Sequence, residues 1–139
     1  MNRITDALNT IHDNIPGTEA GIVLETAAGQ GTAPGYSFGQ IACIINGVKE
    51  SSRLAFCLDT CHAFVAGYDI KTKAGYHNLF KKIDDTIGMQ NLRILHLNDS
   101  KKEMNSRIDR HEDIGKGMIG RKVFELIMRD ESLENITKA

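Results

Sequence analysis

The sequence predicts an α/β fold in which parallel strands alternate with helices. Three observations lead to this prediction: three short apolar runs rich in β-branched residues, a helical pattern of apolar residues after each run, and loops between them that are rich in glycine or polar residues. Strands and helices in this alternation form a parallel sheet with right-handed crossover connections. Because 139 residues suffice for one hydrophobic core, we expect residues 1–139 to form a single domain.

The first unit begins with a surface helix and continues through a strand, a glycine-rich loop and a second helix. Pro16 and Gly17 end the first helical pattern, and Ser37 can cap the second helix. We predict helices over 4–15 and 37–47, a strand over 21–25 and a loop over 26–35. The apolar residues expected to face inward from the first helix are Ile4, Leu8, Ile11 and Ile15.

The same pattern then repeats twice. We predict strands over 53–59 and 91–96, helices over 74–87 and 123–128, and loops over 60–72 and 98–120. Gly88 ends the third helix. The polar residues 129–139 are expected to fray. Side chains alternate along a strand, so Leu54, Phe56 and Leu58 should meet the helices while Cys57 and Asp59 point to the other face.

The composition restricts the location of the protein. With 41% hydrophobic residues, a formal net charge of −1 and no apolar run near the ~20 residues of a membrane helix, the chain reads as a soluble protein with no membrane partner. Three cysteines predict free thiols in a reducing compartment, so we expect a cytoplasmic location, at the nucleoid if the source is bacterial. The near-zero charge provides no long-range attraction for nucleic acid, so any DNA binding must depend on local features.

A charged or ionisable residue ends each predicted strand: Glu25, Asp59 and His96. Parallel strands bring their carboxyl ends to one edge, where α/β proteins build their sites. Two carboxylates and an imidazole are ligands suited to zinc, manganese or magnesium. The alternative is that each residue only caps a strand end, and three such residues in register make that alternative less favourable.

Two further elements strengthen the metal interpretation. His62 follows Asp59 by three residues, and Asp109 and His111 form an Asp-x-His chelate in the predicted loop over 98–120. Taken alone, an Asp-x-His pair in a loop is more often solvated than bound to metal.

The remaining cysteines and histidines have plainer interpretations. Cys57 is expected to fill space as a small apolar residue, and the C-x-x-x-C spacing with Cys61 does not match a redox pair or a zinc knuckle. His12 and His77 lie on predicted surface helices and are expected to be exposed.

The loop GQGTAPG does not match a dinucleotide fingerprint. Its spacing is G-x-G-x-x-x-G, Pro34 interrupts it, and the next acidic residue that ends a strand comes too late in the chain. The glycines could instead let the backbone approach a bulky ligand such as a nucleic-acid strand.

Three runs of residues resemble the endonuclease IV family of abasic-site DNA repair enzymes. They are LETAAGQG at 24–31, CLDTCHAFVAGYD at 57–69 and LHLNDSKKEMNSRIDRH at 95–111, and the similarity extends from Glu25 to Met128. A small departure is Ala55, where the family usually has glycine or arginine. This resemblance implies a TIM-type (β/α)8 barrel that holds three zinc ions, with manganese as a possible substitute. It also implies cleavage of double-stranded DNA on the 5′ side of an abasic site, which leaves a 3′ hydroxyl.

The resemblance also implies roles for individual residues. His62, Asp109 and His111 correspond to the protein ligands of one zinc. Glu25, Asp59 and His96 correspond to catalytic ligands of the other two, with Glu25 bridging. Gln30 and Gly31 resemble a DNA-contacting loop. The basic residues of the 98–120 loop could meet DNA phosphates, namely Lys101, Lys102, Arg107, Arg110 and Lys116.

The chain lacks part of the family pattern. Two histidine ligands expected before residue 1 and a glutamate expected after Ala139 have no counterpart. A (β/α)8 barrel needs about 250 residues. We therefore expect three to four β/α units, about half of the barrel, as a C-terminal-half portion. The complete protein is expected to be a monomer, and the isolated chain weakly active or inactive.

Two alternatives remain open. A sugar isomerase or epimerase of the related barrel type also places Glu, Asp and His around two divalent ions, although it has no use for a third chelate such as His62 with Asp109 and His111. A non-catalytic remnant that binds metal or DNA is the other alternative.

Overall fold

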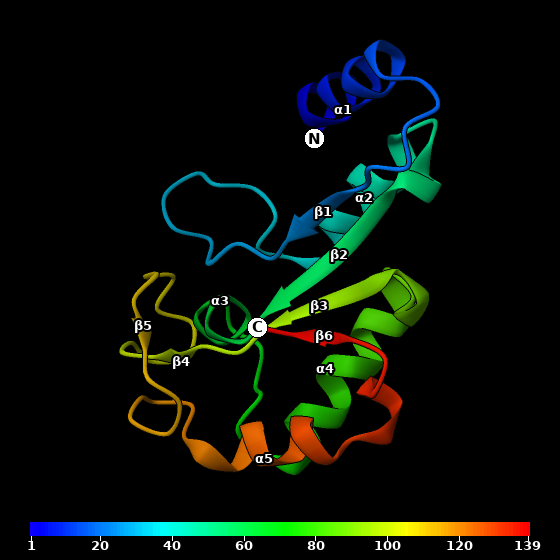
Figure 1. The fold of residues 1–139 in the computed structure, drawn as a ribbon. Coiled ribbons are helices and arrows are strands. Elements are labelled where there is room, and N and C mark those ends of the chain that lie inside the picture. The colour runs from blue at the N-terminus through cyan, green and yellow to red at the C-terminus, as the bar shows by residue number, and fades with distance from the viewer.

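Four parallel strands form the centre of the molecule in the computed structural model, which describes residues 1–139 (Figure 1). The helices are α1 (Asn2–Asn14), α2 (Phe38–Gly47), α3 (Thr60–Val65), α4 (Lys73–Thr86) and α5 (Arg121–Arg129), with short 3-10 turns at Ser51–Arg53, Met89–Asn91 and Glu131–Leu133. The strands are β1 (Ile22–Glu25), β2 (Leu54–Asp59), β3 (Leu92–His96), β4 (Asp99–Ser100), β5 (His111–Glu112) and β6 (Thr137–Lys138). The predicted α/β class with a parallel sheet is confirmed.

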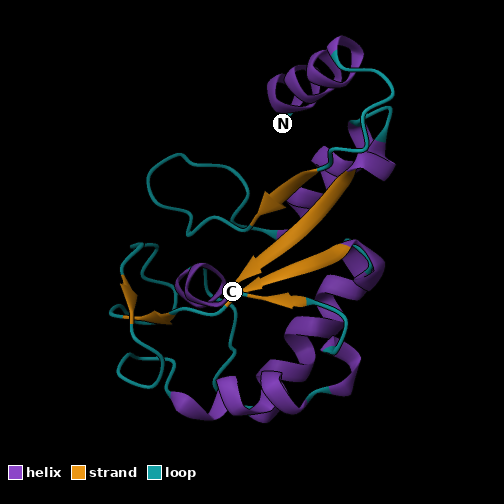
Figure 2. Cartoon of the chain, viewed as in Figure 1, coloured by secondary structure: helices purple, strands orange, loops and turns teal.

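The sheet has the strand order β1-β2-β3-β6, as expected for consecutive right-handed β/α units. In the register of the sheet, Asp59 is opposite His96. Glu25 is opposite Cys57, so β1 ends two residues before the level of Asp59 on β2. Figure 2 shows the long loops gathered at the carboxyl ends of the strands. The polar strand ends consequently meet at one rim.

The core lies between the sheet and helices α2, α4 and α5. Leu54, Phe56 and Leu58 are buried there as their alternation predicted. Phe38 is fully buried, stacks on Tyr68 with ring centroids 4.3 Å apart, and meets the edge of the Phe56 ring. Ser37 caps α2 by accepting a hydrogen bond from the Gln40 amide, as the sequence predicted.

Three predicted loops or tails contain regular structure. The loop over 60–72 begins with α3, and the polar loop over 98–120 contains the antiparallel pair β4 and β5. The prediction that residues 129–139 fray is wrong, because Leu133 is fully buried and β6 pairs with β3 as the fourth strand. These elements are two to six residues long, too short for a hydrophobic period to be visible in the sequence.

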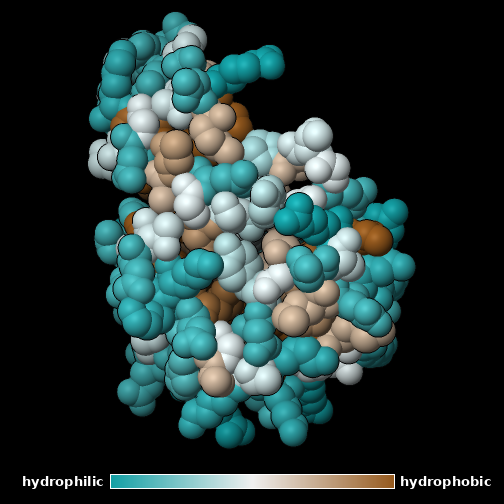
Figure 3. Space-filling model, turned by 180° about the vertical axis from the view of Figure 1, so that it is seen from behind, coloured by the Kyte–Doolittle hydropathy of each residue, from teal (hydrophilic) through white to brown (hydrophobic).

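Helix α1 buries only part of the predicted stripe: Ile4 and Leu8 pack inward as predicted, but Ile11 and Ile15 do not. Leu8 and His12 are buried, whereas Ile11 and Ile15 are 44% and 45% exposed. The expectation that His12 is exposed is therefore wrong, while His77 is exposed as predicted. The reason is that α1 packs against α2, so one flank of α1 faces that helix. Figure 3 shows hydrophobic surface near the end of the molecule that α1 forms.

The C-terminal segment is tied to α4 by a hydrogen bond. The buried Tyr76 hydroxyl donates to Asp130 Oδ2 over 2.7 Å. Burial raises the pKa of the Tyr76 hydroxyl, and the bond to Asp130 raises it further. Partial burial by itself raises the pKa of Asp130, but hydrogen bonds from Ser132 and Tyr76 outweigh it and hold the pKa below its ordinary value of 3.8.

Replacing Tyr76 with phenylalanine should lower the free energy of unfolding at neutral pH by about 1 kcal/mol. Because the lowered pKa of Asp130 stabilises the fold above its ordinary value of 3.8, the difference should shrink as the pH falls below that value. Urea unfolding at several pH values measures it. Tyr36→Phe is the control, because no hydrogen bond of the Tyr36 hydroxyl is present, and an equal loss in both variants would contradict the prediction.

Candidate metal centre

His62 is held in one orientation by the exit of β1. Its Nδ1 lies 2.7 Å from the Thr26 carbonyl oxygen, which can only accept, so Nδ1 carries a proton and Nε2 is the nitrogen that could bind a metal. Thr26 is itself buried, and its hydroxyl accepts a hydrogen bond from the Asp59 amide. One residue therefore fixes both the imidazole and the end of β2, as outer-shell partners of metal ligands do.

The free nitrogen of His62 meets the Asp-x-His chelate. His62 Nε2 lies 3.1 Å from Asp109 Oδ2 and 3.3 Å from His111 Nε2, and His111 Nε2 lies 3.3 Å from Asp109 Oδ1. Bonds of about 2.0–2.1 Å from a tetrahedral zinc ion would separate neighbouring nitrogen donors by ~3.3 Å. The three side chains thus fit a zinc ion, and the predicted convergence of His62, Asp109 and His111 is present in the structure.

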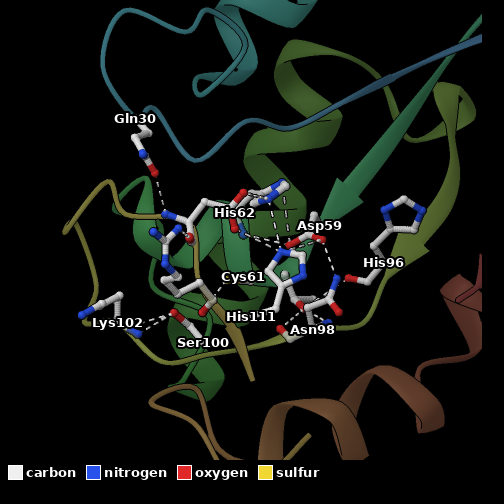
Figure 4. A network of polar contacts seen from close by, with 12 residues as sticks. Gln30, Asp59, Cys61, His62, His96, Asn98, Ser100, Lys102 and His111 are labelled. Carbon is white, nitrogen blue, oxygen red and sulfur yellow. Dashed lines mark hydrogen bonds and ion pairs between the residues drawn. The ribbon is translucent and has the colours of Figure 1, made fainter. Parts of the chain in front are cut away.

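Asp59 lies on the His62 side of the rim, as Figure 4 shows. Its carboxylate accepts hydrogen bonds from the Asn98 amide group over 2.7 Å and from the His62 backbone amide over 2.8 Å. It also lies 3.9 Å from the rings of His62 and His111. That Asp59 shares a metal with Glu25 and His96 stays a prediction.

Glu25 and His96 form a second cluster next to this one. Glu25 Oε1 lies 3.0 Å from His96 Nδ1 and 3.5 Å from His62 Nδ1, so it stands between the two groups. Cys57, opposite Glu25 in the register, brings its sulfur into the same cluster. Glu25 meets His62 on its Nδ1 side, whereas Asp109 and His111 meet it at Nε2, so the role of Glu25 as a bridging ligand stays a prediction.

Both thiols near the rim are protonated at neutral pH. Burial raises the pKa of Cys57 to about 12, and the nearby Glu25 carboxylate adds to the effect. Burial likewise raises the pKa of Cys61 to about 11. All three cysteines are free, as predicted, and Cys43 is exposed.

We therefore expect one thiol per folded chain to react with a disulfide reagent at pH 8, and three after unfolding. A thiol becomes a nucleophile only as the pH rises toward its pKa, so Cys57 and Cys61 should stay unreactive until about pH 11. The Cys43→Ser variant should give no reaction in the folded state. Rapid reaction of that variant at pH 8 would contradict the prediction.

An open pocket of ≈ 440 Å³ lies beside the candidate metal ligands. Glu25, His62 and Asp109 line it together with Gln30 of the glycine-rich loop. The Gln30 side chain accepts a hydrogen bond from the Asp109 amide over 3.2 Å, which links the loop to the chelate (Figure 4). Gly31 has a φ of 62°, a conformation that favours glycine.

The basic residues of the 98–120 loop differ in whether their side chains already have a partner. Arg107 covers the Tyr36 ring, Arg110 donates to the Asp109 carbonyl, and Lys116 pairs with Asp113. Lys101 and Lys102 are exposed and form no ion pair. Lys101 and Lys102 are therefore the freest to meet an anionic ligand.

Sequence reasoning missed Thr26 and Asn98. Thr26 directly follows Glu25, and Asn98 follows His96 with one residue between. Their closeness to strand-terminal ligands is the feature of the sequence that could have indicated a supporting role. Which of these polar residues turns inward depends on the loop conformation, here set by the Thr60 hydroxyl donating to the Asn98 carbonyl oxygen over 2.6 Å.

Fold and rim together define a portion of a TIM barrel with a candidate metal site at the carboxyl ends of its strands. Residues 1–137 match the model of the xylose isomerase-like TIM barrel family, and the chain belongs to this family.

Within this family, the chain is similar to proteins named endonuclease IV. It is 46% identical over 138 residues to a probable endonuclease 4 of Geobacter sulfurreducens, covering 99% of the chain and 47% of that protein. It superposes on the crystal structure of endonuclease IV from Thermus thermophilus with a TM-score of 0.82 and 26% identity, covering 99% of the chain and 49% of that structure. The crystal structure of AsfvAP:AG, at 20% identity and a TM-score of 0.69, shares the fold over 96% of the chain and 50% of its own length.

These comparisons confirm the resemblance to endonuclease IV. The chain spans about half the length of the relatives it matches, so the expectation of about half a barrel is confirmed as well. None of the helices combines the length and the apolar character needed to cross a membrane.

Proposed function

We propose that this chain is the metal-binding portion of a zinc-dependent endonuclease that hydrolyses double-stranded DNA on the 5′ side of an abasic site in base excision repair. The relatives named endonuclease IV support a nuclease. One observation favours a metal-dependent one: His62, Asp109 and His111 present their donor atoms 3.1 to 3.3 Å apart. Oxygen and nitrogen donors in this number suit zinc, with manganese as a substitute.

In this proposal the rim residues have different roles. His62, Asp109 and His111 hold one zinc, and Glu25, Asp59 and His96 act as catalytic ligands toward the others. Bound zinc supplies Lewis acidity, which makes water a better nucleophile near neutral pH and stabilises charge on phosphate oxygens. Glu25, placed between His62 and His96, orients both groups, while Thr26 and Asn98 keep His62 and Asp59 in place.

DNA would approach across the pocket of ≈ 440 Å³. Gln30 and Gly31 lie on the glycine-rich side, and Lys101 and Arg110 project from the loop that carries the chelate. Side chains of this kind bind backbone phosphates without reading sequence. We propose that residues 1–139 act as one domain, that the complete enzyme is a monomer, and that it works in the cytoplasm.

An incision assay tests the proposal. The substrate is a labelled duplex with one abasic site, tested with the 139-residue chain and with the protein extended to the length of its relatives, each with and without a chelator. We expect the extended protein to cut 5′ to the site, leave a 3′ hydroxyl and lose activity with the chelator, while the 139-residue chain is much slower. Metal-independent cutting, or no cutting by the zinc-loaded extended protein, would overturn it.

The same preparations distinguish the two alternatives. Manganese-dependent conversion of a free sugar, without incision, would indicate the isomerase class. Zinc binding by the extended protein with neither reaction would indicate a protein that binds metal without chemistry.

A further inference from the structure

We propose that Asp99 is a positioning residue that fixes the segment 113–120 and, through it, the strand carrying His111, and thereby sets the metal affinity of the chelate. The metal part of this inference rests on the proposed function. Asp99 does not belong to the ligand set, and its carboxylate bonds to backbone amides rather than to His62, Asp109 or His111. Its effect would act through the backbone.

The Asp99 carboxylate is fully buried and is surrounded by backbone amides rather than by a basic side chain. Oδ1 accepts from the amides of Ser100 over 2.8 Å and Ile119 over 2.9 Å. Oδ2 accepts from the amides of Gly115, Gly117 and Gly120 over 3.0, 3.0 and 3.2 Å. Hydrogen bonds to an ionised acceptor are roughly twice as strong as neutral ones, so the four that come from residues 115–120 form a strong anchor for the segment.

Apart from Asp99, the segment is held mainly by Ile119, whose side chain is buried in the hydrophobic core. Three of its residues are glycines, which lose the most conformational entropy on ordering, and Ile114 and Met118 are 50% and 46% exposed. Outside the Asp99 contacts, the Met118 amide donates to the Ser100 carbonyl, the Lys116 amide to the Asp113 carbonyl and the Asp113 amide to the Glu112 side chain. The buried Asp99 carboxylate is therefore the main polar anchor of the segment, beside the buried Ile119 side chain.

The anchored segment continues directly from β5. In the β4–β5 pair, Asp99 is opposite Glu112 and Ser100 is opposite His111, and the Lys101 amide donates to the Arg110 carbonyl over 2.9 Å. Each strand of this pair has two residues, so the ladder alone holds His111 weakly. Asp99 holds the chain on the far side of β5 as well, which leaves His111 between two fixed points.

Gly117 packs against this anchor and provides a second way to disturb it. A Cβ at this position would overlap both the Ser100 carbonyl oxygen and the Asp99 carboxylate. Gly117→Ala should therefore push the segment off the carboxylate without removing the charge. Asp113→Asn is the matched control, because Asp113 is an exposed carboxylate of the same segment whose side chain pairs with Lys116.

Two measurements on the 139-residue chain test the inference: hydrogen exchange of the backbone amides without metal, and zinc affinity by competition with a chromophoric chelator. In Asp99→Asn and in Gly117→Ala, the amides of residues 115–120 should exchange at least about tenfold faster relative to those of β2. Zinc affinity should fall at least about tenfold, the loss typical of residues that support ligands. Asp113→Asn should stay within about twofold in both measurements.

Unchanged exchange and zinc affinity in Asp99→Asn would overturn the inference. Equal acceleration in β2 and in residues 115–120 would also overturn it, because it would show a general loss of stability. A wild-type chain that binds no zinc would contradict the metal site of the proposed function instead, and exchange would still decide whether Asp99 holds the segment.

Discussion

Replacing His62 with alanine is expected to lower the zinc affinity of the chain by more than about 100-fold, since loss of an outer-shell partner alone costs roughly 10–100-fold. His62 supplies the nitrogen that lies 3.1 Å from Asp109 and 3.3 Å from His111. Its removal leaves only Asp109 and His111, two donors that both come from the 98–120 loop. Competition with a chromophoric chelator measures the affinity, and circular dichroism checks that the variant is folded.

His77→Ala is the control for this experiment. His77 is an exposed histidine on α4, away from the rim, so its removal subtracts one imidazole without touching the site. If His77→Ala and His62→Ala reduce zinc affinity equally, zinc is bound by surface histidines in general and the assigned centre is wrong.

Replacing Phe38 with alanine is expected to lower the free energy of unfolding by about 3–5 kcal/mol. This is a large part of the roughly 5–15 kcal/mol that holds a domain together. Phe38 has no exposed surface, stacks on Tyr68 and meets Phe56 at 6.0 Å, so its loss opens a cavity where α2, β2 and the segment after α3 join. The midpoint and slope of urea unfolding measure the change.

Met128→Ala is the matched control, because Met128 is 64% exposed and its removal should change stability by no more than about 0.5 kcal/mol. A loss below about 1 kcal/mol for Phe38→Ala would show that the side chain is not packed as described.

Much of the fold could be predicted because its longer elements carry their own periodicity. The apolar alternation of residues 54–58 and the helical pattern of residues 74–87 each correspond to one element of the structure. Neither β6 nor α3 has such a pattern. Thr137 and Lys138 form a strand only because β3 lies beside them, and α3 begins where the Asp59 side chain accepts from the His62 amide.

The candidate site, too, could be predicted only in part. Glu25, Asp59 and His96 could be placed at one rim from the count of residues between them, because parallel strands end at the same edge. The meeting of His62 with Asp109 and His111 required knowledge of family motifs, since 47 residues separate His62 from Asp109. His12 was misplaced because helical periodicity gives a stripe of residues but not the partner helix against which it packs.

The hydrogen bond from His62 to the Thr26 carbonyl affects which cations can compete for the candidate metal site. The imidazole is oriented before any ion arrives, so a tetrahedral ion meets donors that are already in place. Magnesium requires octahedral oxygen coordination and gives up its water reluctantly, so a pair of nitrogen donors 3.3 Å apart offers it little. A rigid imidazole would thus discriminate against the most abundant divalent cation of the cell.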